Sequence, residues 1–149
     1  MFKAIASVLG IGYLKGGGTV AAAVCCLALY LAPNQALTTD LALAGLLTAG
    51  LLGLGTWAAH RVEPAWGKDS YRVVIDEVAG VWVGLLGVPL TGPRLLAGLV
   101  LFRFFDIVKP LGIKRMEKLP GGYGVMLDDV LAGVYTLILM HLALGLRWL

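Results

Sequence analysis

Six acidic residues stand at the ends of apolar segments or beside glycine turns, where carboxylates can bind a cation or activate water. They are Asp69, Asp76, Glu77, Asp106, Asp128 and Asp129. Ionisable groups within apolar helices are costly, so they usually have an ionic partner or a chemical task. One reading is that they form structural salt bridges with Arg72, Arg103 and Lys109. Because the set contains no histidine or thiol, the reading we favour is a site for Mg²⁺, which prefers oxygen ligands.

The predicted metal ligands are Asp76, Asp106 and Asp129, which come from three separate apolar segments. Asp76 precedes Gly80 by four residues and Asp129 precedes Gly133 by four, so each acid has a neighbour without a side chain on its own helix face. Such gaps let helices approach closely. The prediction adds three acids that complete the site or activate water, namely Glu77, Asp128 and Asp69.

Basic residues and glycine runs accompany these acids. Arg103, Asp106 and Lys109 are spaced three apart, which places them within roughly a third of a helix circumference. Arg103 and Lys109 are predicted to neutralise phosphate oxygens. Two glycine runs, at 16–18 and 121–124, could present backbone N–H groups to the same anion. The other predicted substrate-binding residues are Lys68, Thr19, Gly121 and Gly122.

The composition is that of a membrane protein. Apolar residues make up 59% of the 149 residues and charged residues 14%, against about 25% charged in a soluble domain. The mean hydropathy is +0.87. The net charge of +3 is small and the basic residues do not cluster with exposed aromatic residues, so we expect no nucleic-acid partner. A basic rim on an apolar body instead fits anionic lipid headgroups.

The pattern predicts one all-α domain over residues 1–149, a polytopic membrane helical bundle of about four to five apolar helices. The predicted helices cover 19–32, 41–59, 73–88, 94–108 and 128–146. Between them we expect a turn at Pro33 and Asn34, a polar loop over 60–72 and a turn over 89–93. Residues 1–15 are predicted to be an interfacial or re-entrant segment, because Lys15 and three glycines interrupt any signal-peptide core.

Four residues that often carry chemistry are predicted to be structural. Cys25 and Cys26 are adjacent within an apolar run, and neighbouring cysteines pair only with strain, so we expect small buried hydrophobes. His60 and His141 each stand alone, without a second histidine or thiol at metal-binding spacing.

The distribution of charge predicts the orientation. If all five helices cross, ten lysines and arginines fall on the N-terminal side and only Arg94 and Arg147 on the other. This asymmetry places the N-terminus in the cytoplasm. The same assignment puts eight of the nine acids on that side and leaves Asp40 outside. The polar site is therefore expected on the cytoplasmic side.

Four stretches together resemble the phosphatidylglycerophosphatase A family of bacterial membrane phosphatases. They are GGGT at 16–19, KDSYRVVIDEVAG at 68–80, FRFFDIVKPLGI at 102–113 and GGYGVMLDDVLAG at 121–133. The resemblance implies an all-helical fold in the bacterial cytoplasmic membrane. It also implies Mg²⁺-dependent removal of the terminal phosphate of phosphatidylglycerophosphate, a membrane phospholipid, to yield phosphatidylglycerol.

Two motifs depart from the family pattern. The family's Pro-Gly-Thr is Gly17-Gly18-Thr19 here, with alanines in place of the Gly-Ser that follows. The family's Lys-Pro-x-Pro-Ile has Gly112 in place of its second proline. The acidic residues match the family throughout.

The residues alone leave other functions open. A small divalent-cation transporter or channel could use Asp76, Asp106 and Asp129 as ligands within the membrane, whereas a non-catalytic scaffold needs none of the acids. Release of phosphate from a lipid phosphomonoester separates these alternatives. The sequence does not decide whether water or an aspartate attacks, how many metal ions bind or which oligomer forms.

Overall fold

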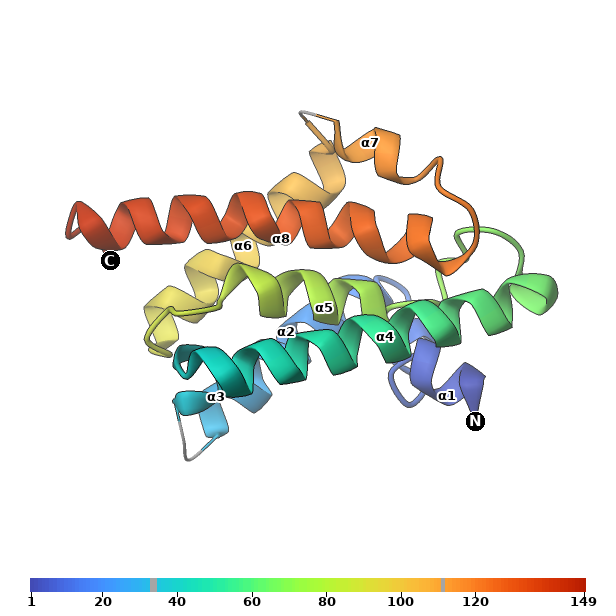
Figure 1. Ribbon diagram of the computed structural model, residues 1–149, viewed down its shortest axis with the longest axis horizontal. Helices are drawn as coiled ribbons and strands as arrows, with labels where there is room; N and C mark the ends of the chain where they lie inside the picture. The colour runs from blue at the N-terminus through green and yellow to red at the C-terminus, as the bar shows by residue number, and fades with distance from the viewer. Residues whose placement is uncertain (33–34, 111) are drawn as a thin grey trace.

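The computed structural model describes residues 1–32, 35–110 and 112–149, and all secondary structure in these ranges is helical (Figure 1). This confirms the predicted all-α class. The elements in chain order are α1 (Phe2–Ala6), the 3₁₀ turn η1 (Ile11–Tyr13), α2 (Gly17–Leu31), α3 (Ala36–Thr39), α4 (Leu41–Trp66), α5 (Ile75–Gly84), α6 (Gly92–Val108), α7 (Ile113–Met116) and α8 (Gly122–Gly145). The turn predicted at residues 33–34 lies outside the described residues.

Two of the described helices, α4 and α8, are long and apolar enough to cross a membrane. With 26 and 24 residues they exceed the roughly 20 residues that a span needs. The prediction of four to five such helices is therefore wrong in number. The reason is length, because α2 has 15 residues, α5 has 10 and α6 has 17.

Several predicted helix boundaries are also wrong. α4 continues to Trp66, because Pro64 lies in its last turn, where a missing N–H removes only one hydrogen bond. α8 begins at Gly122, since Gly121 at φ +60° ends the preceding loop. Asp128, the first residue of the predicted helix 128–146, is therefore near the end of the second turn of α8.

The short helix α5 lies at the centre of the bundle, packed against α8, α2, α4 and α6 (Figure 1). Its closest crossing is with α8. A Cβ at Gly133 would clash with the Gly80 carbonyl oxygen, and one at Gly80 would lie 2.7 Å from the Asp129 carbonyl oxygen. The predicted close approach at these two glycines is confirmed.

The polar ends of the helices gather at one end of the molecule. Figure 1 shows the end of α4 and the starts of α5 and α8 on the right, with the α5–α6 turn and the C-terminus on the left. Arg94, in the first turn of α6, donates a hydrogen bond of 3.3 Å to a backbone oxygen of Leu149, the last residue. The grouping of acids at one end thus follows from the antiparallel order of the helices.

Of the four residues predicted to be structural, the two cysteines lie in packing positions and the two histidines are exposed. Cys26 is buried in the core and Cys25 packs against that core, and both thiols are free. His141 lies 2.9 Å from the Leu86 carbonyl oxygen through its Nε2 atom. His60 lies beside Gly121 at the start of α8.

The α5–α8 crossing can be tested with Gly133→Ala. The added methyl group meets the Gly80 backbone, so we expect the free energy of unfolding to fall by about 1–3 kcal/mol, the usual cost of overpacking. The matched control is Gly50→Ala, because no atom lies within 4 Å of a Cβ there. Thermal unfolding in detergent measures both. Equal melting temperatures for the two variants would contradict the close crossing.

Candidate active site

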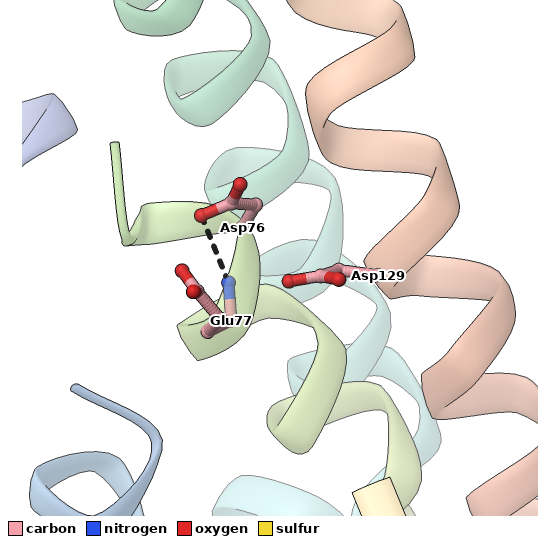
Figure 2. A group of neighbouring side chains, drawn as sticks. All are labelled: Asp76, Glu77 and Asp129. Carbon is pink, nitrogen blue, oxygen red and sulfur yellow. Dashed lines mark hydrogen bonds between the residues drawn. The ribbon is translucent and has the colours of Figure 1, made fainter. Parts of the chain in front are cut away.

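Three carboxylates from two helices share one space at the α5–α8 crossing (Figure 2). Asp76 and Glu77 lie in the first turn of α5, as predicted, and Asp129 projects toward them from α8. One oxygen atom from each residue lies within 4.8 Å of the others. The backbone N–H of Glu77 also donates a 3.1 Å hydrogen bond to Asp76 Oδ1. The arrangement brings three negative charges to one point.

The glycines on three helices make this approach possible. Gly80 and Gly133 let α5 and α8 cross closely enough for their acids to meet. On the other side, a Cβ at Gly18 of α2 would overlap Glu77 Oε1. The Glu77 side chain therefore fills the space that this glycine leaves, which fixes the start of α2 against the acids.

The cluster is poorly compensated. Asp76 is 8% exposed, and this burial raises the pKa of Asp76 well above its usual range, with further increases from Glu77, Asp129 and Asp128. Burial also raises the pKa of Glu77. Glu77 Oε2 is buried and has no hydrogen-bond partner among the described residues. A set of oxygen donors with excess negative charge fits a hard divalent cation.

Arg103 and Asp106 stand next to the cluster on α6. Arg103 Nη1 lies 2.6 Å from Asp106 Oδ2 and 3.9 Å from Glu77 Oε1. Nε and Nη1 of Arg103 are nevertheless buried without a partner in hydrogen-bond geometry. Asp106, predicted as a metal ligand, pairs with Arg103 three residues before it and also interacts with Asp129 of the three-carboxylate group. Its role as a metal ligand stays a prediction.

Lys109 does not share a face with Arg103 and Asp106, contrary to the prediction. α6 ends at Val108, and Lys109 follows at φ +47°. Its Nζ atom lies 2.7 Å from Asp128 Oδ2 and 2.6 Å from Glu117 Oε1. Burial lowers the pKa of Lys109, but its hydrogen bonds to Asp128 and Glu117 outweigh that effect and raise the pKa above its usual value.

A cavity of about 490 Å³ opens beside Glu77 and Arg103. Thr19, a predicted substrate-binding residue, lines this cavity together with the glycines 16–18. Sequence reasoning missed four other lining residues, Tyr13, Leu14, Lys15 and Tyr71. The first three are signalled only by their position just before the glycine run, and Tyr71 only by its place in the stretch 68–80 that resembles the family.

The remaining predicted site residues lie away from the cavity. Lys68 and Asp69 are exposed in the α4–α5 loop, where Asp69 has φ +54° and interacts electrostatically with Asp128. Gly121 and Gly122 pack under α4, where a Cβ at either position would clash with His60 or with the Thr56 carbonyl oxygen. Their predicted contact with substrate stays a prediction, and packing alone accounts for both glycines.

An all-helical fold that brings three carboxylates together beside an arginine and a cavity is compatible with the class of proteins that hydrolyse phosphate esters. The chain belongs to the phosphatidylglycerophosphatase A family, whose sequence profile matches residues 4–144. This membership confirms the resemblance found in the sequence and makes the protein an enzyme, a phosphoric monoester hydrolase.

Three relatives illustrate the family. A Bacteroides thetaiotaomicron protein named "putative phosphatidylinositol-3-phosphatase" is 48% identical over 136 residues, covering 88% of this chain and 81% of the relative. The phosphatidylglycerophosphatases A of Haemophilus influenzae and Escherichia coli are 40% and 32% identical over 98 residues. Each match covers 64% of this chain. It covers 60% of the Haemophilus protein and 56% of the Escherichia protein. No solved structure is significantly similar to the chain.

The role of Lys109 can be tested with Lys109→Met. Asp128, which is only 4% exposed, would lose its cation, so we expect the free energy of unfolding to fall by about 3 kcal/mol. Adding Asp128→Asn removes the uncompensated charge and should recover most of the loss. The control is Lys118→Met, an exposed lysine between α7 and α8. Wild-type thermal stability with lost activity would instead assign Lys109 to the substrate.

Proposed function

We propose that the protein hydrolyses the terminal phosphate monoester of phosphatidylglycerophosphate, with Mg²⁺, to give phosphatidylglycerol and inorganic phosphate. The observation that carries this proposal is the group of Asp76, Glu77 and Asp129 beside Arg103 at the edge of a cavity. The family and the names of its Haemophilus and Escherichia members support the substrate.

The three carboxylates fit Mg²⁺ by their chemistry. Asp76, Glu77 and Asp129 would hold the ion, since they offer only oxygen donors and Glu77 Oε2 has no other partner. When bound, Mg²⁺ neutralises charge on phosphate oxygens and lowers the pKa of an attacking water. The presence of the ion would also remove the repulsion among the three carboxylates.

Arg103 would bind the phosphate group. Its side chain lines the cavity, and its Nε atom has no hydrogen-bond partner among the described residues, so this donor is available to a phosphate oxygen. The ion pair with Asp106 holds the guanidinium in place, which makes Asp106 a positioning residue in this proposal. The Thr19 side chain at the cavity wall adds a hydroxyl donor.

We also propose that the chain crosses a bacterial cytoplasmic membrane several times with this site at the cytoplasmic face. Two helices of sufficient length and the concentration of lysine and arginine at the polar end support this orientation. A cytoplasmic face gives the site direct access to a phospholipid headgroup and to Mg²⁺.

A second substrate is supported by the Bacteroides relative, whose name gives phosphatidylinositol 3-phosphate. Both lipids carry a phosphomonoester on a headgroup that is joined to diacylglycerol by a phosphodiester. Purified enzyme should release phosphate from phosphatidylglycerophosphate with a kcat/KM at least tenfold above that for phosphatidylinositol 3-phosphate. The reverse order would establish the second lipid as the substrate.

The carboxylates can be tested by separate Asp76→Asn, Glu77→Gln and Asp129→Asn changes. Each is expected to abolish Mg²⁺-dependent phosphate release while the protein stays folded, because the change removes a ligand and also relieves repulsion. Mg²⁺ should raise the melting temperature of the wild type but not of the variants. Asp40→Asn is the matched control, since Asp40 caps α4 at the far end and asparagine caps equally well. Normal turnover in two of the three variants would refute the metal site.

A further inference from the structure

The cavity beside the acidic group has a second set of lining residues that the reaction at Arg103 does not use. Tyr13, Lys15 and Tyr71 line it together with Glu77 and Arg103. Its volume of about 490 Å³ is typical of sites that hold a whole small-molecule headgroup, which run from about 300 to 1,000 Å³. The space therefore accommodates more than the reacting phosphate.

Two cations line this cavity, Arg103 and Lys15, and they differ in their contacts with the described residues. Arg103 pairs with Asp106, and Arg72 nearby lies over the rings of Trp66 and Tyr71 at 5.9 and 5.3 Å. Within the described parts of the chain, Lys15 makes no ion pair, hydrogen bond or ring contact, and its side chain is exposed. Its charge is thus available to an anion in the cavity.

The backbone around Lys15 is fixed relative to the acids. Gly16 caps α2 at φ +75°, and a Cβ at Gly17 would lie 2.7 Å from the Ile11 carbonyl oxygen. Gly18 packs directly on the Glu77 carboxylate. Lys15 directly precedes these packed glycines and lines the same cavity as Glu77 and Arg103.

The two tyrosines suit a headgroup at a membrane surface. Tyr13 and Tyr71 are 57% and 72% exposed, and the Tyr13 ring packs edge-on against Trp66 with centroids 5.9 Å apart. Trp66 is the last residue of α4, a candidate membrane span. Aromatic residues with a polar tip concentrate where a span leaves the bilayer, at the depth of lipid headgroups.

We propose that Lys15, with Tyr13 and Tyr71, binds the phosphodiester of a phospholipid whose headgroup phosphomonoester lies at Arg103. This inference rests on the proposed function and names the contacts by which the enzyme would select among lipid phosphates. The site prefers lipids that carry both groups, such as phosphatidylglycerophosphate and phosphatidylinositol 3-phosphate, over phosphatidic acid, which has the monoester alone. Lys15 is then a specificity-determining residue that takes no part in the chemical step.

The test compares Lys15→Ala, Lys15→Arg and the wild type on three lipids in the same detergent micelles. For phosphatidylglycerophosphate, Lys15→Ala should raise KM about tenfold, the effect of one lost charge-assisted contact, and leave kcat within about twofold. The same shift is expected for phosphatidylinositol 3-phosphate if that lipid is turned over. Phosphatidic acid should be hydrolysed equally by all three proteins, and Lys15→Arg should restore KM.

Lys114→Ala is the control, because Lys114 is exposed and does not line the cavity. An equal loss on phosphatidic acid would show that Lys15 serves the reacting phosphate, and an unchanged KM would show that it binds no substrate. Either result overturns the proposal.

A binding measurement keeps this test separate from the proposed function. Short-chain phosphatidylglycerol has the phosphodiester and lacks the monoester, so calorimetry with it reports on the Lys15 site alone. We expect Lys15→Ala to weaken its Kd about tenfold. If the wild type releases no phosphate from any lipid, the proposed function fails, whereas equal Kd values for the wild type and Lys15→Ala overturn the Lys15 site.

Discussion

Three carboxylates that lie close together repel one another, and the close crossing of α5 and α8 holds them in place. Asp76, Glu77 and Asp129 meet only because α5 and α8 cross at two glycines, with no room for a methyl group on either side. Any side chain at Gly80 or Gly133 would separate the helices and disperse the acids. The same helix crossing therefore packs the core and assembles the site. This explains why α5, although short, lies at the centre of the bundle.

Neighbouring acids in this site have different electrostatic roles. Asp128 is bound to Lys109, which also binds Glu117 and so ties the loop before α8 to that helix. Asp129, the next residue, has no ion pair with a cation among the described residues and faces α5. Two adjacent acids of α8 therefore have different surroundings: Lys109 compensates Asp128, whereas Asp129 adjoins the carboxylates of α5.

Sequence patterns predicted the residues that meet at the crossing but not all of their partners. The spacing of Asp76 to Gly80 and of Asp129 to Gly133 was enough to predict a close helix approach, because it depends only on helix periodicity. Spacing also put Arg103 near Asp106, yet it could not show that they pair with each other. Lys109 was misplaced because its left-handed backbone conformation redirects the side chain, and no pattern encodes that. Helix lengths were the weakest prediction, since apolar runs do not reveal where tertiary contacts end a helix.

We propose above all that the α5–α8 crossing builds a divalent-cation site beside Arg103 and the cavity. The most direct measurement is a crystal structure of the enzyme with Mn²⁺ in place of Mg²⁺, read from anomalous scattering. We expect one strong anomalous-difference peak for Mn²⁺, at bonding distance from carboxylate oxygens of both α5 and α8 and next to Arg103. Mn²⁺ bound elsewhere, with Asp76, Glu77 and Asp129 hydrogen-bonded to one another and no peak between them, would contradict it.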